Sequence, residues 1–297
     1  MNKKIGSYRV VDFPPERRFM ANLLNLTWAK HCMYGLLEVD VTDAKQFIED
    51  YKAQTGELLS FTGYLAFCLA CAVDEDKAVQ AYRKGSKQLV MFDDVNVGVM
   101  IERKIGEKRV LMGDVIRGAN HKTYREIHQQ IRSAQANLAP PSTKMVSRFR
   151  SAMLLPWPLS RLVNVLLRMA LHSDPTIPVS MTGTVGITAV GMFGEGQGGW
   201  GIAPVSHSVD LIVGSTAWKP AIVEGRIEPR EILNLTVVFD HDVIDGAPAA
   251  RFTRRLVELI ESGYGLDEEQ SALPSDTGSG AARPEVAEEQ ETNSVSV

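Results

Sequence analysis

The sequence predicts an α/β fold in which strands and helices mix without the strict alternation of parallel βαβ units. Short runs of β-branched and apolar residues, which indicate strands, separate longer segments whose apolar residues recur at helical spacing. Of the 297 residues, 44% are hydrophobic and 23% are charged, which is typical of a globular protein. After Gly265 the composition shifts to Ser, Gly, Ala, Pro and Glu. We therefore expect one folded domain over residues 1–265 and a disordered acidic tail over residues 266–297.

Charge, cysteine content and hydropathy argue against several classes of protein. The formal net charge is −4, so no basic excess indicates nucleic acid binding. Of Cys32, Cys68 and Cys71, the last two lie in an apolar helical segment, which favours reduced core thiols over a disulfide framework or a zinc site. The N-terminus lacks a signal peptide's apolar region, and residues 148–172 contain no apolar run near the ~20 residues of a membrane span. We expect a cytoplasmic protein with no metal and no nucleic acid or membrane partner.

The first half of the chain predicts a mixture of strands and helices. Two prolines ahead of Glu16 are typical of a helix start, Thr42 is a cap residue ahead of the next helix, and Ser60 starts a long apolar helix. The strands are expected at residues 8–11, 36–42, 90–92, 95–101 and 110–116, and the helices at residues 16–30, 44–54, 61–73 and 123–135.

The second half begins with residues 148–172, which predict a buried or pocket-lining helix. The stretch over residues 182–194 contains Thr188, whose side chain is either functional or simply turned inward on a strand. The glycine-rich residues 194–201 are followed by no Lys-Ser/Thr pair and no helix, so a flexible connection is favoured over a phosphate-binding loop. A further strand is expected at residues 209–215.

Residues 235–260 contain the strongest functional signal. An apolar strand over residues 235–239 and a helix over residues 249–260 flank His241, Asp245 and Gly246. A histidine titrates near working pH, so His241 is suited to take a proton from a thiol, hydroxyl or amine. The alternative is a capped turn with a structural histidine. Asp245 either orients the turn or pairs with an arginine, Gly246 allows an unusual backbone shape, and Asp240 and Asp242 either pair similarly or face solvent.

The spacing His241-x-x-x-Asp245-Gly246 resembles the active-site signature shared by dihydrolipoamide acyltransferases, the core of 2-oxo acid dehydrogenase complexes, and chloramphenicol acetyltransferase. Residues 37–42 (LEVDVT), 93–99 (DDVNVGV) and 183–194 (GTVGITAVGMFG) are similar to further segments of the first group. The resemblance implies a two-layer sandwich with a mixed β-sheet, chloramphenicol-acetyltransferase-like, that assembles as a homotrimer or a larger cage.

The resemblance also implies roles for individual residues. His241 is the general base, and Thr188 stands where the family has a serine that donates a hydrogen bond to the tetrahedral oxyanion. Arg17 or Arg18 is expected to support the site by pairing with Asp245. The active site then lies between subunits, with His241 of one chain facing Thr188 of its neighbour.

The chain departs from the family pattern at three further places. Asp242 stands where the usual form has Arg, Ala189 stands where it has Asn, and residues 140–178 differ from the segment that lines the acceptor channel. Asp76-Lys77-Ala78 matches the tripeptide that carries lipoyl-lysine, but Lys77 follows a helix, whereas a lipoyl-lysine sits at a hairpin tip.

The function expected from these features is CoA-dependent acyl transfer. CoA is a co-substrate and not a tightly bound cofactor. No lipoyl domain is present in the sequence, so the acceptor is expected to be a dihydrolipoyl group on a separate protein or a small molecule. The alternative is a non-catalytic trimeric scaffold or shell derived from the same core.

Overall fold

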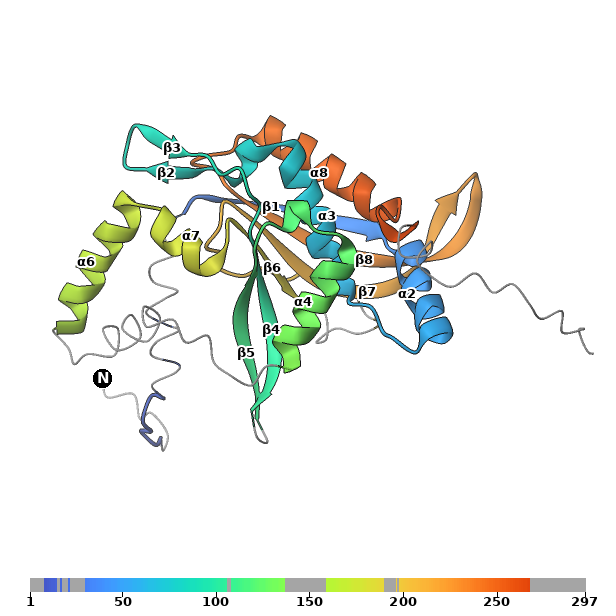
Figure 1. Cartoon of the computed structure of the whole chain (residues 1–297), viewed down its shortest axis with the longest axis horizontal. Helices are drawn as coiled ribbons and strands as arrows, with labels where there is room; N and C mark the ends of the chain where they lie inside the picture. Colours follow the sequence, from blue (N-terminus) through green and yellow to red (C-terminus); the bar gives the residue numbers. More distant parts are fainter. Residues whose placement is uncertain are drawn as a thin grey trace, which may run out of the picture.

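The computed structural model describes residues 8–14, 17, 21, 30–105, 108–136, 159–189, 196 and 198–267. Within these ranges, strands form one mixed sheet and helices pack against one of its faces (Figure 1). One layer of helices on one sheet is a two-layer α/β sandwich. The predicted fold class is therefore confirmed. Residues 268–297, which make up most of the expected tail, lie outside the described part.

The six strands of the main sheet follow the order β1-β8-β7-β6-β4-β5. Antiparallel pairs join β1 to β8, β8 to β7 and β4 to β5, whereas β6 is parallel to both β7 and β4. This mixture explains why the sequence lacks strict βαβ alternation. The strands are β1 (Cys32–Asp40), β4 (Val97–Ile105), β5 (Lys108–Ile116), β6 (Val185–Ala189), β7 (Val209–Val223) and β8 (Arg226–Asp240), and a separate hairpin consists of β2 (Tyr82–Lys84) and β3 (Gln88–Val90).

Three of the helices, α3, α4 and α8, lie over the sheet, and α3 contacts the other two (Figure 1). None of the helices in the described part of the chain is long and apolar enough to cross a membrane. The helices are α2 (Thr42–Thr55), α3 (Phe61–Glu75), α4 (Tyr124–Ala136), α6 (Leu159–Ser173), α7 (Thr176–Thr182) and α8 (Gly246–Glu261), with short 3₁₀ turns η1 (Lys77–Gln80) and η2 (Ala119–His121).

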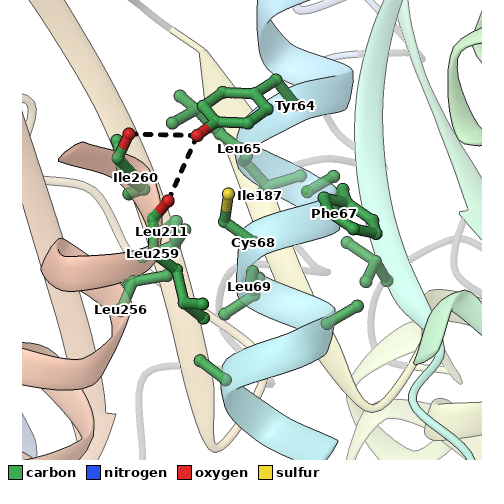
Figure 2. Close-up of a cluster of buried hydrophobic side chains, with 14 of the residues drawn as sticks. Tyr64, Leu65, Phe67, Cys68, Leu69, Ile187, Leu211, Leu256, Leu259 and Ile260 are labelled. Carbon is green, nitrogen blue, oxygen red and sulfur yellow. Dashed lines mark hydrogen bonds between the residues drawn. The ribbon is translucent and has the colours of Figure 1, made fainter. Parts of the chain in front are cut away.

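Tyr64 on α3 connects this helix to the end of α8 inside the core (Figure 2). Its hydroxyl lies 3.2 Å from the carbonyl oxygen of Leu259 and 3.0 Å from that of Ile260. Carbonyls in the last turn of a helix have no partner within the helix, so the Tyr64 hydroxyl supplies one. Burial raises the pKa of Tyr64 and keeps the hydroxyl protonated as a donor. The core thus fixes α8, the helix that follows His241.

Several helix starts and strand positions differ from the expectations. Residues 8–11 form no strand: Tyr8, Val10 and Val11 are exposed, and a lone strand has no ladder to join. Ser60 caps α3 as predicted by accepting a hydrogen bond from the Gly63 amide, at 3.1 Å. Thr42 does not cap α2, because it is the first residue of the helix and Val41 occupies the cap position. Of the expected helix over residues 16–30, three positions are described: residues 17 and 21 are helical, and residue 30 is not.

Candidate functional site

His241 is the first residue of the turn that joins β8 to α8. Its amide donates to the carbonyl oxygen of His31 at 2.7 Å, and the amides of Val243 and Ile244 both donate to the Asp240 carbonyl at 3.0 Å. Ile244 is buried in the core and anchors the far side of the turn. The His241 side chain is 48% exposed. The turn is therefore fixed while the imidazole remains accessible, which a reactive histidine requires.

Asp245 is the carboxylate in ion-pair range of the His241 ring. The His241 Nδ1 and Asp245 Oδ1 atoms are 3.8 Å apart, which is too long for a hydrogen bond. Asp245 precedes the first residue of α8, but its side chain makes no cap hydrogen bond and is 89% exposed. If Nδ1 carries its proton toward Asp245, Nε2 keeps a lone pair and can act as a base. Catalytic contacts are often long in a free enzyme and tighten when substrate binds.

The two arginines expected to support Asp245 are not both described. Arg17 is helical and exposed, and Arg18 lies outside the described residues. Among the residues that the structure places, no arginine lies within ion-pair distance of Asp245. The pairing of Asp245 with Arg17 or Arg18 stays a prediction.

The carboxylates on either side of His241 are both paired, rather than facing solvent alone. Asp240 Oδ2 accepts a hydrogen bond from Lys30 Nζ at 2.7 Å. Asp242 Oδ2 accepts from Arg83 Nη1 at 2.7 Å, and Asp242 Oδ1 lies 2.9 Å from His31 Nδ1. The hydrogen bond from His31 lowers the pKa of Asp242, and Arg83 lowers it further against the opposing effect of partial burial. Pairing was one of the two alternatives left open for these carboxylates, but the partners themselves, 159 to 211 positions away, have no local signature.

A second histidine, His207, is buried near the start of β7 and is not a candidate base. Its Nδ1 lies 2.7 Å from Asp210 Oδ1, and its Nε2 lies 3.1 Å from the Thr182 carbonyl oxygen. Both ring nitrogens are taken up by partners inside the protein, so neither is open to a substrate. A Cβ at Gly186 would collide with Asp210 and His207, so the strand here requires glycine. The His207 ring therefore links the start of β7 to the end of α7.

Thr188 lies on β6, half-buried, and far from His241 in the same chain. It is level with Ile212 on β7, and Ile212 is level with Thr236 on β8. His241 lies five residues beyond Thr236 along β8 and two strands away from β6. With ~3.3 Å per residue and ~4.8 Å per strand, the separation is on the order of 20 Å. One chain therefore does not bring the two side chains together.

Gly246 differs from the expectation of an unusual backbone shape. It is the first residue of α8 and is not among the glycines with a positive φ angle. A Cβ at this position meets no atom within 4 Å. The backbone of this chain therefore does not require glycine at position 246. Pro248 lies in the first turn of α8, where its missing amide hydrogen costs no helical hydrogen bond.

No metal centre is evident in the part of the chain that the structure places. There, no group of three or more His, Cys, Asp or Glu side chains could hold a metal ion. None of the three cysteines forms a disulfide, and Cys68 is fully buried, with burial raising the pKa of its thiol.

Comparison with known proteins points to one family. The model of the family described as 2-oxoacid dehydrogenases acyltransferase (catalytic domain) matches residues 6–143 and 163–266. The lipoamide acyltransferase component of the branched-chain alpha-keto acid dehydrogenase complex of Bacillus subtilis is 25% identical over 243 residues, which cover 80% of this chain and 48% of that protein. The dihydrolipoyllysine-residue acetyltransferase component of the pyruvate dehydrogenase complex of Mycoplasma capricolum is 24% identical, covering 76% of this chain and 44% of that protein. The chain spans about half the length of these relatives.

Solved structures show the same fold. The cubic core of the pyruvate dehydrogenase multienzyme complex matches with a TM-score of 0.64 and 21% identity, covering 89% of this chain and 95% of that chain. The dihydrolipoamide acetyltransferase of Azotobacter vinelandii matches with a TM-score of 0.62 and 22% identity, again covering 89% and 95%.

Proposed function

The chain belongs to the family of 2-oxoacid dehydrogenase acyltransferases, and from this premise we propose that it moves an acyl group between CoA and a thiol, with His241 as the general base. The observation that carries the proposal is the accessible imidazole on a fixed turn, with Asp245 at 3.8 Å and the neighbouring carboxylates paired elsewhere. A histidine in this setting can take a proton at working pH and return it.

The acceptor that fits best is a dihydrolipoyl thiol on another polypeptide. Both relatives from B. subtilis and M. capricolum carry lipoamide or dihydrolipoyllysine in their names. His241 takes the proton from the acceptor S–H group, and the thiolate attacks the carbonyl carbon of the acyl-CoA thioester. The tetrahedral intermediate then expels the CoA thiolate, which receives the proton back from His241. CoA acts as a co-substrate throughout.

A second chain completes this site in the proposal. The proposal gives Thr188 the role of donating its hydroxyl to the oxyanion, and Thr188 lies on the order of 20 Å from His241 of the same chain. A homotrimer in which one chain supplies His241 and its neighbour supplies Thr188 resolves this distance. The A. vinelandii structure was solved to define the catalytic roles of a serine, a histidine and an asparagine. The candidates here are a threonine, a histidine and an aspartate.

The first test measures transfer from acetyl-CoA to free dihydrolipoamide. His241→Ala is expected to lose at least about 100-fold in kcat, because a positioned general base typically supplies that factor or more. His121→Ala is the matched control, because His121 is an exposed histidine on η2. His241→Ala with unchanged turnover would contradict the proposal. Wild-type protein that binds CoA without turnover would point to another acceptor, and protein that binds no CoA would point to a non-catalytic core.

A further inference from the structure

Asp242 stands at the centre of a charged cluster beside His241. The cluster consists of Asp242 in the turn, Arg83 on β2, and His31 just ahead of β1. Figure 1 shows the β2–β3 hairpin on the side of the molecule where α8 begins. Three segments that are distant in the sequence thus meet at the residue that follows the candidate base.

The contacts of Asp242 use both carboxylate oxygens. Oδ2 accepts from Arg83 Nη1 at 2.7 Å, and Oδ1 accepts from His31 Nδ1 at 2.9 Å, because an ionised carboxylate can only accept. The Asp242 amide donates to Asp240 Oδ1 at 3.1 Å. The Asp242 side chain is only 28% exposed. The orientation of Asp242 is therefore held by two side-chain contacts and one backbone contact.

His31 contacts the turn a second time through its backbone. Its carbonyl oxygen accepts the hydrogen bond from the His241 amide at 2.7 Å. The same residue therefore holds the backbone of His241 and, with its ring, the side chain of Asp242. Removal of the ring alone leaves the backbone contact in place, so the two effects can be separated by mutation.

The cluster also bears on which carboxylate can pair with the His241 ring. Arg83 pairs with Asp242 and Lys30 pairs with Asp240, so both carboxylates flanking the histidine already have cationic partners. Asp245 is exposed and has no described partner other than His241. Asp245 is thus the carboxylate left in ion-pair range of the His241 ring, 3.8 Å from Nδ1, and if Nδ1 carries its proton toward Asp245, Nε2 is left for the proton of the acceptor.

We propose that Arg83 and His31 are positioning residues for acyl transfer, which act through Asp242 to hold the turn that presents His241. The inference rests on the proposed function of His241. An ion pair at the protein surface contributes little to stability, so loss of Arg83 leaves the protein folded. A displacement of about 1 Å at a reacting group can cost 100-fold in rate, so a smaller shift of the turn is expected to cost roughly 10-fold.

The test is a double-mutant cycle on Arg83→Gln and Asp242→Asn, with kcat and KM measured for acetyl-CoA and dihydrolipoamide. Each single change is expected to lower kcat roughly 10-fold with little change in either KM. The double variant is expected to be no slower than either single variant, because both changes break the same contact. His31→Ala, which keeps the backbone contact, is expected to show a smaller loss in the same direction.

Lys87→Gln is the matched control, because it removes one positive charge from the exposed turn of the same hairpin. It is expected to retain wild-type kcat, and thermal unfolding is expected to show all variants folded. Unchanged kcat in Arg83→Gln, or additive losses in the double variant, would overturn the inference. A raised KM with unchanged kcat would overturn it too, because Arg83 would then bind substrate. If His241→Ala is itself fully active, it is the proposed function that fails.

Discussion

Thr236 is a fully buried threonine on β8 whose hydroxyl has no hydrogen-bond partner in the described part of the chain. It lies between Ile212 on β7 and Leu36 on β1, level with Thr188. A buried polar group without a partner costs ~1–3 kcal/mol of stability. Thr184, which is equally buried, differs because its hydroxyl oxygen accepts from the Asn96 amide at 3.0 Å.

Thr236→Val is expected to raise the free energy of unfolding by about 1 kcal/mol, because valine keeps the shape and removes the unpaired hydroxyl. Thr184→Val is the control and is expected to lower it, because the Asn96 amide loses its acceptor. Urea unfolding curves measure both values. A loss of stability in Thr236→Val comparable to that in Thr184→Val would show that the Thr236 hydroxyl does have a partner.

Single residues differ in how far the sequence could predict their roles. The position of His241 between a strand and a helix was predictable, because the apolar strand before it and the helical spacing after it are local features. Arg83 and Lys30 were not, because a surface arginine or lysine has no local signature of its partner. Their pairing with Asp242 and Asp240 depends on how distant segments fold together.

His128 links helix α4 to the start of α3. It is buried, its Nδ1 accepts a hydrogen bond from the Ser60 amide at 3.0 Å, and its Nε2 lies 3.0 Å from Glu57 Oε1. Because Nδ1 is an acceptor here, Nε2 carries the proton and donates to Glu57. Burial lowers the pKa of His128, although Glu57 acts in the opposite direction. The folded protein therefore favours the neutral form of the His128 ring.

The stability of the protein is expected to fall as the pH drops below about 6.5, the ordinary pKa of histidine in the unfolded chain. Below that pH the histidine binds a proton in the unfolded chain but not in the folded chain. The contribution of His128 to the free energy of unfolding is therefore fully present above pH ~6.5 and is lost as the pH falls toward the lowered pKa of His128 in the folded chain. His128→Asn should flatten this dependence in urea unfolding between about pH 5 and 7.5. His121→Asn, at an exposed histidine, should not. Equal slopes in wild type and His128→Asn would rule out His128 as the source.

Elements were predictable where the signal was local. The start of α3 at Ser60 followed from a cap residue ahead of an apolar run. The strand expected at residues 8–11 did not form, because apolar alternation alone cannot show whether a strand has a neighbour. β7 and β8 also extend beyond their apolar parts to Val223 and Arg226, since their antiparallel hydrogen bonds continue through polar residues.

The order of the sheet is a property of the whole molecule that residue patterns do not encode. β6 lies between β4 and β7, although these strands are far apart in the sequence. The mixed sheet was expected only from the resemblance to acyltransferases, and the structure confirms it. The same sheet order separates Thr188 from His241 by two strands and five residues. The proposed active site therefore depends on assembly of more than one chain.

The most direct test of this account is complementation between two inactive chains. Thr188→Val is expected to lose about 100-fold or more in kcat by loss of the oxyanion donor, and His241→Ala to lose as much by loss of the base. In a randomly mixed, coexpressed assembly, about one quarter of the sites combine an intact His241 from one chain with an intact Thr188 from its neighbour. Purified mixed assemblies should therefore recover about a quarter of the wild-type rate of acetyl transfer to dihydrolipoamide. Mixed assemblies that remain as inactive as the two parent variants would contradict a site shared between chains.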